Sequence, residues 1–560
     1  MAPHREISTH RAYALVNGRR VHYRRWGSGP AILALHGSPQ SSRCMEAIGR
    51  RLATAGFCVI APDTPGNGLS SPLTVTDATT ADFAEALLEL ADELQLGRFG
   101  VYGFHTGATI ACALAARHPE RVSALACDGL PDWSDAERQL LLEGYLPRFE
   151  PNWDGSHLCW LWARVEEQTV FFPWHMAKPE YRMHYDVSPM PHLHGNALDF
   201  LESGDNYRMP YHAAFTFKAG DWLSALTTPH LFAAMELDPL AAHLQRPGFN
   251  GVATRAFSTP EAMHLAFISL FNEQPGDPAP APIYPRADAF GLSRGWVGED
   301  RRALAWVGNL TTASVQRPLV LLHGAGGSQR SFSDCLAELT KQRPAIAVEL
   351  PGHGDSDRRQ DDAPSSVAAI GREIALACQR LGLTEYDVAG LHLGGQVAAW
   401  LVNEGHAVTG ASLGLSAVDA AERDDWASNY APSLEPEFDG AQLVRAFRIA
   451  RWERLFYPWF KRNRSYLVEL SSDLQPADVH RRAVELLRAG PCWQGAVTAE
   501  AEFDLISQSP PPAKFKLFAV DGDPRSTAAQ MGRLQYPVAR LSEQSSHWAK
   551  PLAALGYPLK

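Results

Sequence analysis

Residues 99–107 read Phe-Gly-Val-Tyr-Gly-Phe-His-Thr-Gly, and this stretch is the most informative part of the sequence about the fold. Its first four residues form a short apolar run, which is typical of a buried strand. Apolar residues at helical spacing follow at 108–116, so the pattern predicts a strand, a tight turn and a helix. Glycine stands two residues before and two residues after His105, which places this histidine in the turn.

The same pattern occurs a second time in the chain. Gly390-Leu-His392-Leu-Gly394 repeats it at an offset of 392 − 105 = 287 residues. Apolar runs that end in His-Gly, at His36 and His323, are also 287 residues apart, and Asp238-Pro and Asp523-Pro are 285 apart. The chain is therefore predicted to be a tandem duplication of a unit of about 270 residues.

Each half alternates short apolar runs with helical stretches, which predicts α/β domains with a mostly parallel sheet flanked by helices. We expect domain 1 at 1–272 and domain 2 at 288–560. The proline-rich residues 273–287 between them predict a semi-rigid linker. The rhythm breaks at about 132–222 and about 420–506, where we expect inserted helical caps.

Composition excludes several classes of protein. Of the 560 residues, 45% are hydrophobic and 20% charged, which is typical of a globular protein, and the net charge of −11 argues against nucleic-acid binding. No apolar stretch reaches 18 residues, so we expect no membrane span or membrane partner. Eight scattered cysteines without a C-x-x-C pair, and a start without the apolar core of a signal peptide, predict a cytoplasmic protein.

The ordered set of motifs resembles the α/β-hydrolase superfamily, twice over. In each half a strand ends in His-Gly, and a Pro-Gly-x-Gly loop, the Gly-x-x-x-Gly turn, a cap, an Asp-Pro pair and a final histidine follow. The spacing from His-Gly to the central histidine is the same in both halves, since 105 − 36 and 392 − 323 both equal 69. His36-Gly-Ser-Pro-Gln is also similar to a segment of haloalkane dehalogenases and epoxide hydrolases, which use aspartate as the nucleophile.

The sequence departs from the family at the turn itself. The family's nucleophile elbow is normally Gly-x-Ser-x-Gly, because a tight strand-to-helix turn exposes the central side chain. His105 and His392 occupy that position, and neither half has Ser, Cys or Asp there. Because both halves carry histidine, the ancestral unit is expected to have carried it before duplication.

The resemblance implies an acid after a late strand and a base after the last strand. In the first half Asp238 and His264 fit these positions, although the segment around His264 also has a helical pattern. In the second half Asp523 and His547 fit them. Asp128, which follows the strand after His105, is an alternative acid position.

The resemblance also implies an oxyanion hole made of backbone N–H groups that stabilise negative charge on a carbonyl oxygen. The residues expected to supply these N–H groups are Ser38 and Thr106 in the first half and Ala325 and Leu393 in the second.

Several chemistries remain open for a histidine at the elbow. It could attack an acyl group as a nucleophile, or accept a proton as a general base. A metal site built from His105, His264 and Asp238 is a further alternative, but nothing in the spacing demands it. We therefore expect neither a metal nor a cofactor.

We expect a cofactor-free hydrolase of a small, fairly apolar carbonyl compound such as an ester, a lactone or an activated C–C bond. Tryptophan and phenylalanine in the first cap favour such a small-molecule substrate. The alternatives are an inactive binding or regulatory protein, and a lyase or isomerase on the same fold. Duplication is also consistent with two domains packed as an intramolecular pseudo-dimer.

Overall fold

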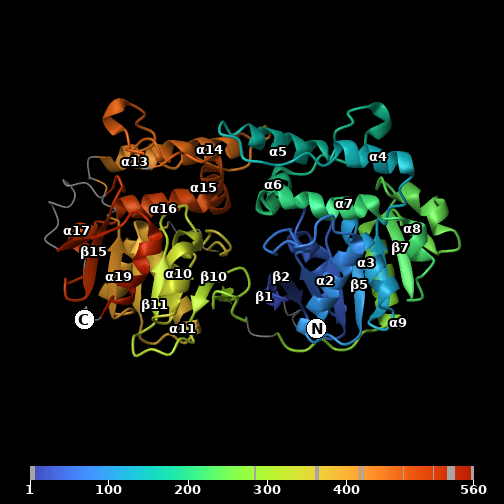
Figure 1. Cartoon of the computed structure of the whole chain (residues 1–560), viewed down its shortest axis with the longest axis horizontal. Coiled ribbons are helices and arrows are strands. Elements are labelled where there is room, and N and C mark those ends of the chain that lie inside the picture. The colour runs from blue at the N-terminus through green and yellow to red at the C-terminus, as the bar shows by residue number, and fades with distance from the viewer. Residues whose placement is uncertain are drawn as a thin grey trace, which may run out of the picture. The chain divides into compact units, whose positions relative to one another are not determined.

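A computed structural model describes residues 7–282, 286–359, 365–414, 418, 422–470, 472–508, 510–525 and 537–556 (Figure 1). Residues 283–285 of the expected linker and residues 420, 421 and 471 of the expected second cap lie outside this description. The chain divides into two compact units, Met1–Glu150 with Trp160–Pro285 and Pro151–Cys159 with Arg286–Lys560.

The first unit is built on one eight-stranded sheet. Its strand order is β1-β2-β4-β3-β5-β6-β7-β8, and β2 pairs antiparallel with both neighbours while the strands from β4 to β8 pair in parallel. This confirms the predicted fold class. The strands are β1 (His10–Val16), β2 (Arg19–Trp26), β3 (Ala31–Leu35), β4 (Cys58–Pro62), β5 (Phe99–Phe104), β6 (Val122–Asp128), β7 (His230–Met235) and β8 (Thr254–Phe257).

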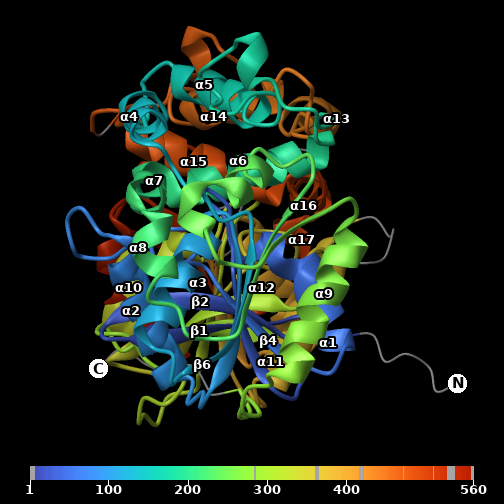
Figure 2. The ribbon, with the colours of Figure 1, turned by 90° about the vertical axis from the view of Figure 1, so that its right-hand side faces the viewer.

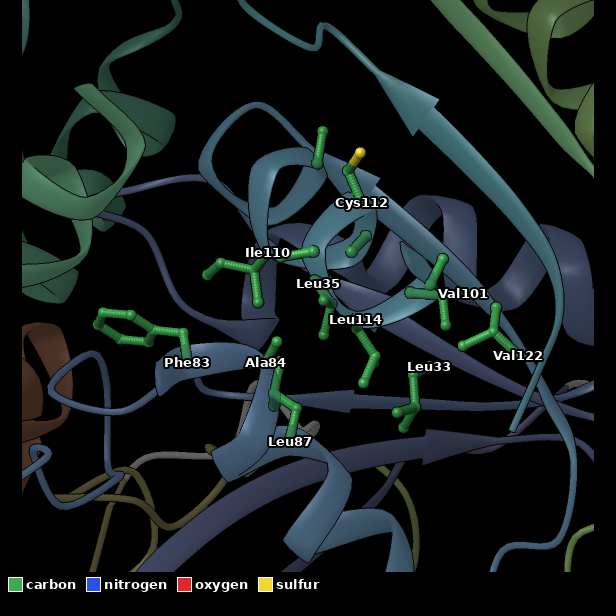
Figure 3. Packing of buried hydrophobic residues seen from close by; sticks show 14 of the residues in the cluster. Leu33, Leu35, Phe83, Ala84, Leu87, Val101, Ile110, Cys112, Leu114 and Val122 are labelled. Carbon is green, nitrogen blue, oxygen red and sulfur yellow. The ribbon is translucent and has the colours of Figure 1, made fainter. Parts of the chain in front are cut away.

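Both faces of this sheet are covered by helices. Figure 2 shows α1 (Glu46–Thr54) and α9 (Pro260–Glu273) on one side and α2 (Thr80–Glu93) and α8 (Ala219–Leu223) on the other. Side chains of β3 alternate between the faces, because successive residues of a strand point to opposite sides. Leu33 and Leu35 pack against α2 and α3 (Thr106–Arg117), as Figure 3 shows, while Ile32 and Ala34 pack on the opposite side.

The second unit repeats this topology. Its strand order, β9-β10-β12-β11-β13-β14-β15-β16, is that of the first sheet. Its helices are α10 (Ser333–Thr340) and α19 (Ala549–Ala553) on one core, and α11 (Val367–Arg380) and α12 (Leu393–Asn403) on the other. The strands are β9 (Ser293–Val297), β10 (Leu304–Asn309), β11 (Leu319–Leu322), β12 (Ala345–Val348), β13 (Asp387–Leu391), β14 (Thr409–Leu413), β15 (Phe515–Val520) and β16 (Val538–Leu541).

Each unit carries a helical insertion between its sixth and seventh strands. In Figure 1 the cap helices α6 and α7 run across one end of the first sheet. The first insertion contains α4 (Asp135–Gly144), α5 (Ser156–Glu167), α6 (Met190–Ser203) and α7 (Arg208–Thr216). The second contains α13 (Arg423–Asn429), α14 (Ala441–Glu453), α15 (Pro476–Ala489), α16 (Pro491–Glu502) and α17 (Leu505–Gln508).

The expected linker begins as part of the first unit. Asp277 accepts a hydrogen bond from the backbone N–H of Ala31 and donates its own N–H to the carbonyl of Arg98. These bonds tie the chain to strands β3 and β5 just after α9. No helix within the described residues combines the length and apolar character needed to cross a bilayer.

Candidate active site

Both elbow histidines lie in the strained turn that the family pattern predicts. His105 follows β5 with φ 48° and ψ −110°, and His392 follows β13 with φ 49° and ψ −111°. A residue other than glycine rarely adopts positive φ, and such strain is characteristic of functional sites. The turn therefore keeps the geometry of a nucleophile elbow although its central residue is histidine.

The glycines on either side of His105 are required by close backbone packing. A Cβ atom on Gly103 would collide with the carbonyl of Gly107, and one on Gly107 would collide with the carbonyl of Leu35. Gly390 and Gly394 are held against backbone atoms in the same way in the second unit. The Gly-x-His-x-Gly spacing thus lets the helix pack closely against its strand.

Each elbow histidine is hydrogen-bonded to the aspartate that follows the seventh strand of its sheet. His105 Nε2 lies 2.8 Å from Asp238 Oδ2, and His392 Nε2 lies 3.1 Å from Asp523 Oδ2. When the carboxylate is ionised it accepts the Nε2 proton, so the neutral histidine presents the Nδ1 lone pair as its basic atom. The structure thus brings together the predicted elbow and acid residues of both halves.

The two acidic neighbours of His105 determine its protonation. Burial by itself lowers the pKa of His105, but the charge and hydrogen bond of Asp238, together with the charge of Asp128, raise the pKa above its ordinary value. Burial also opposes ionisation of Asp238, yet His105 holds the pKa of Asp238 below its usual range. Asp238 is therefore ionised at neutral pH and stabilises the cationic form of His105.

Asp128 forms a second buried polar pair beside the elbow. The Tyr102 hydroxyl donates to Asp128 Oδ2 at 3.0 Å, and burial raises the pKa of Asp128 to about 6, against the charge of His105. In the second unit the backbone N–H of His392 bonds the carbonyl of Leu413, as that of His105 bonds Asp128. Leu413 therefore replaces Asp128, and the second unit has no carboxyl group at this position.

The expected oxyanion groups of the first unit border a common space. Ser38 and Thr106 both line the cavity that contains His105. Thr106 is the first residue of α3, so its backbone N–H has no carbonyl partner within the helix. In the second unit Ala325 lines the cavity that contains His392, and Leu393 begins α12.

The histidines of the His-Gly motifs hold these loops in place. His36 lies 2.9 Å through Nδ1 from the carbonyl oxygen of Gly37 and accepts the N–H of Thr64 on Nε2 at 2.9 Å. His323 makes the same two contacts, with the carbonyl of Gly324 and the N–H of Leu350. Both are buried, and burial lowers the pKa of each, so they act as neutral structural links.

The two histidines expected to act as bases, His264 and His547, lie outside the cavities of the elbow histidines. His264 is on α9, where Arg51 and Glu261 are its charged neighbours. His547 is exposed and lies 3.2 Å through Nδ1 from the hydroxyl of Ser542. Neither lines the cavity of its own elbow histidine, so the described residues do not assemble the metal alternative that included His264.

The cavity of the first unit is predominantly apolar. It has a volume of about 530 Å³ and lies between the elbow and the cap. Its aromatic lining residues are Phe104, Trp133, Tyr145, Phe172, Tyr185, Tyr211 and Phe215. The side chain of His105 is 36% exposed, whereas that of Asp238 is only 8% exposed. A ligand in this cavity can therefore reach the histidine while the aspartate stays behind it.

The cavity of the second unit is larger and strongly charged. Its volume is about 920 Å³, and it contains His392 and Asp523. The charged residues that line it besides this pair are Arg330, Arg454, Arg481, Arg482, Arg525, Glu453, Asp473, Asp478 and Glu485. The two cavities thus differ in chemistry although their elbows agree.

Comparison with known families agrees with this geometry. Residues 30–166 match the family model described as alpha/beta hydrolase fold, and residues 319–554 match the model described as alpha/beta hydrolase family. The chain is a tandem member of the alpha/beta hydrolase family. The resemblance inferred from the motifs is therefore confirmed for both halves.

Individual relatives match only short parts of this chain. A putative non-heme haloperoxidase of Mycobacterium phage D29 is 36% identical over 115 residues, 20% of this chain and 41% of that protein. An epoxide hydrolase of Caballeronia sordidicola is 34% identical over 110 residues, 20% of this chain and 33% of that protein. The chain thus matches 41% of the length of one relative and 33% of the other.

Among solved structures, epoxide hydrolase A from Mycobacterium thermoresistibile is 17% identical with a TM-score of 0.38. The similarity covers 47% of this chain and 98% of that one.

Sequence reasoning missed Tyr185 in the first hydrolase domain. Its hydroxyl interacts with Asp238 and helps to lower the pKa of that carboxyl, and the backbone N–H of Leu240 donates to Asp238 Oδ1 at 2.8 Å. Tyr185 belongs to an irregular segment of the cap before α6, where no periodic pattern marks a functional residue. Its role depends on how the cap folds back over the sheet.

Sequence reasoning also missed Arg525 in the second hydrolase domain. Arg525 donates to Glu500 at 2.6 Å and to the Tyr430 hydroxyl at 2.9 Å. Burial opposes ionisation of Asp523, but interactions first with His392 and then with Arg525 lower its pKa to about 2. The corresponding residue of the first domain is Leu240. Comparing Asp-Pro-Leu with Asp-Pro-Arg between the halves would have indicated this difference.

Proposed function

We propose that this chain is a hydrolase of a small, fairly apolar carbonyl compound and that its first domain performs the chemistry. The single observation that carries the proposal is the His105–Asp238 pair at the elbow. In this pair a histidine occupies the position of the serine of a Ser-His-Asp triad, and the histidine is hydrogen-bonded to an aspartate as in the triad. The apolar cavity above it supports an ester, a lactone or an activated C–C bond as the substrate.

In the proposed reaction His105 acts as a general base. Its Nδ1 accepts a proton from water, the water oxygen forms a bond to the substrate carbonyl carbon, and the carbonyl oxygen becomes an oxyanion. The N–H groups of Ser38 and Thr106 stabilise this oxyanion. When the intermediate collapses, the bond to the leaving group breaks and the imidazolium returns its proton to that group.

The general-base role is favoured over the nucleophilic role by the position of His264, the residue expected to serve as the second base. An acyl group on His105 would need a second base to activate water for its removal. His264, the expected candidate, lies on α9 outside the cavity. A base that removes the water proton directly needs only the pair that is present.

We prefer the first domain because an arginine interacts with Asp523, whereas the corresponding residue beside Asp238 is Leu240. The carboxylate of Asp523 interacts with the cationic Arg525 as well as with His392. The partners of Asp238 besides His105 are the Tyr185 hydroxyl and the N–H of Leu240, and neither carries a charge.

The test is turnover of a panel of esters and lactones by the wild type and by His105→Ala, with His392→Ala as the matched control. Removal of a general base typically costs about 10²- to 10⁴-fold in rate, and we expect that loss for His105→Ala alone. Full activity in His105→Ala would refute the proposal. Products that contain no oxygen from ¹⁸O-labelled water would indicate a lyase or isomerase instead.

The pH profile gives an independent check of the pair. The base must be neutral to act, so kcat/KM is expected to rise through a pKa above the ordinary histidine value of about 6.5. Asp238→Asn removes the main group that raises this pKa, so the rising limb is expected to move to lower pH. An unchanged limb in Asp238→Asn would show that the titrating group is not His105.

A further inference from the structure

A buried arginine lies in the core of the first cap. Arg164 is on α5 and is only 1% exposed. Its guanidinium carbon lies 5.0–6.0 Å from the centres of five aromatic rings, those of Trp174, Tyr145, Phe200, Tyr211 and Tyr207. The faces of aromatic rings attract cations, so these rings offset part of the cost of removing the charge from water.

Arg164 has no counterion in the described part of its domain. Nη1 donates to Gln168 Oε1 at 2.6 Å, and the guanidinium also interacts with the Tyr211 hydroxyl, while Nε and Nη2 are buried without a well-formed hydrogen bond. The charge of Arg164 acts on Tyr207, Tyr211 and His175. Burial raises the pKa of both phenols and lowers that of His175, so all three are neutral at pH 7. Burying a cation without an anionic partner is costly.

Gln168 connects this cation to the proposed catalytic cavity. Arginine can only donate hydrogen bonds, so the Gln168 oxygen must be the atom that faces Arg164. The amide NH₂ group of Gln168 is then the part left for the cavity, which Gln168 lines together with Tyr145 and Tyr211. The cap therefore presents donors, backed by a positive charge, to whatever occupies the cavity.

The cap of the second domain has different residues at the positions of Arg164 and Gln168. At the offset of 285 residues found for the caps, Ile449 replaces Arg164 and Glu453 replaces Gln168. Glu453 accepts from Nε of Arg482, which comes from α15, at 2.9 Å. The second cap thus supplies a carboxylate at the position where the first cap has a neutral amide next to an arginine.

We propose that the first domain binds carbonyl substrates that carry a carboxylate, with Gln168 as the contacting residue and Arg164 as the charge behind it. The carboxylate of the substrate supplies the anionic partner that Arg164 lacks, and the rest of the substrate occupies the apolar cavity. This inference rests on the proposed function only in calling the ligand a substrate, because binding does not require His105 to act.

The binding test compares carboxylates with uncharged amides of the same shape. We would titrate benzoate, phenylacetate and 4-phenylbutyrate, and the corresponding amides, into His105→Ala by calorimetry. Charge-assisted hydrogen bonds predict that at least one carboxylate binds about tenfold or more tightly than its amide. No preference across the series, including no binding of either member, would overturn the proposal.

Two substitutions in the same background locate the preference. Gln168→Glu supplies an internal counterion, as Glu453 does in the second domain, and is expected to abolish the preference for carboxylates. Gln274→Glu adds the same charge at an exposed position beyond α9 and is expected to retain it. Arg164→Met removes the cation while nearly conserving volume, and serves as a second variant if Gln168→Glu does not fold. A preference that survives Gln168→Glu, or survives Arg164→Met where Gln168→Glu does not fold, would overturn the proposal.

Turnover then separates this proposal from the previous one. In the wild type, a half-ester of a dicarboxylic acid is expected to exceed its dimethyl ester in kcat/KM by about tenfold or more. A carboxylate preference in binding without turnover would refute only the catalytic proposal. Turnover without preference for the half-ester would refute only the carboxylate subsite.

Discussion

At the scale of single residues, the same imidazole serves two purposes in this chain. His36 is buried and neutral, and it hydrogen-bonds a loop into place. His105 is accessible from a cavity and stands beside two carboxyl groups, so its charge responds to pH. Burial and neighbouring charge, rather than residue type, separate the structural histidine from the reactive one.

Asp128 gives a prediction at this scale. Its pKa in the folded protein, about 6, is above the value of 3.8 expected in the unfolded chain. Its protonated form therefore favours folding below pH 3.8, and this contribution is lost as pH rises through about 6. The difference corresponds to roughly 3 kcal/mol of the free energy of unfolding at pH 8 relative to pH 3.

The free energy of unfolding of Asp128→Asn, relative to that of the wild type, is consequently expected to be higher at pH 8 than at pH 4. Urea unfolding of both proteins at the two pH values measures this. The same stability difference at both values would contradict the assigned pKa.

At the scale of elements, the elbow depends on how closely α3 approaches β3 and β5. The glycines around His105 allow that approach because they place no Cβ atom between the backbones. The strained φ of His105 is then maintained by the strand on one side and the helix on the other. The element-scale requirement is therefore steric and does not depend on which side chain stands at the centre.

Gly107→Ala tests this requirement. Its Cβ would meet the backbone of Leu35 and His36, so overpacking is expected to lower the free energy of unfolding by about 2 kcal/mol or more. Gly220→Ala on α8 is the matched control, because the nearest atom to its Cβ is 3.9 Å away. The control is expected to change stability by less than about 1 kcal/mol. Equal effects of the two substitutions in urea unfolding would argue against close packing at the elbow.

At the scale of the whole molecule, duplication has preserved the framework and changed the sites. Both sheets have the same strand order, and both elbows pair histidine with aspartate. The second domain has leucine at the position of Asp128 and has Arg525 beside its aspartate. The two domains thus share the His–Asp pair and differ in the charges around it, and we propose the pair of the first domain as catalytic.

Separate cores predict separate unfolding of the two domains. Leu33 and Leu321 are fully buried, each in the sheet of its own unit. Truncation of a buried leucine to alanine typically costs about 2–5 kcal/mol, so Leu33→Ala and Leu321→Ala are each expected to lower one transition in differential scanning calorimetry. A single transition that both variants shift equally would show that the domains unfold as one cooperative unit.

Local sequence was sufficient for the framework and for half of the site. The apolar runs, the paired glycines and the constant offset predicted the sheets, the elbows and the register of Asp238 and Asp523. These features are local because a strand, a tight turn and a helix start depend on residues a few positions apart. Because the chain is duplicated, each motif of one half could be compared with the corresponding position of the other half.

The expected final histidines mark where local reasoning stopped. His264 matched a position in the family's order of motifs, yet the helix that contains it points this residue toward Arg51 rather than toward the elbow. Tyr102, Tyr185 and Arg164 carried no signal in sequence, because their roles depend on groups brought near by packing. The sequence alone was enough to predict two α/β-hydrolase-fold domains with a histidine at each elbow. Only the tertiary structure decided the partners and charges around each histidine, because burial and long-range contacts determine which groups are ionised and which are paired.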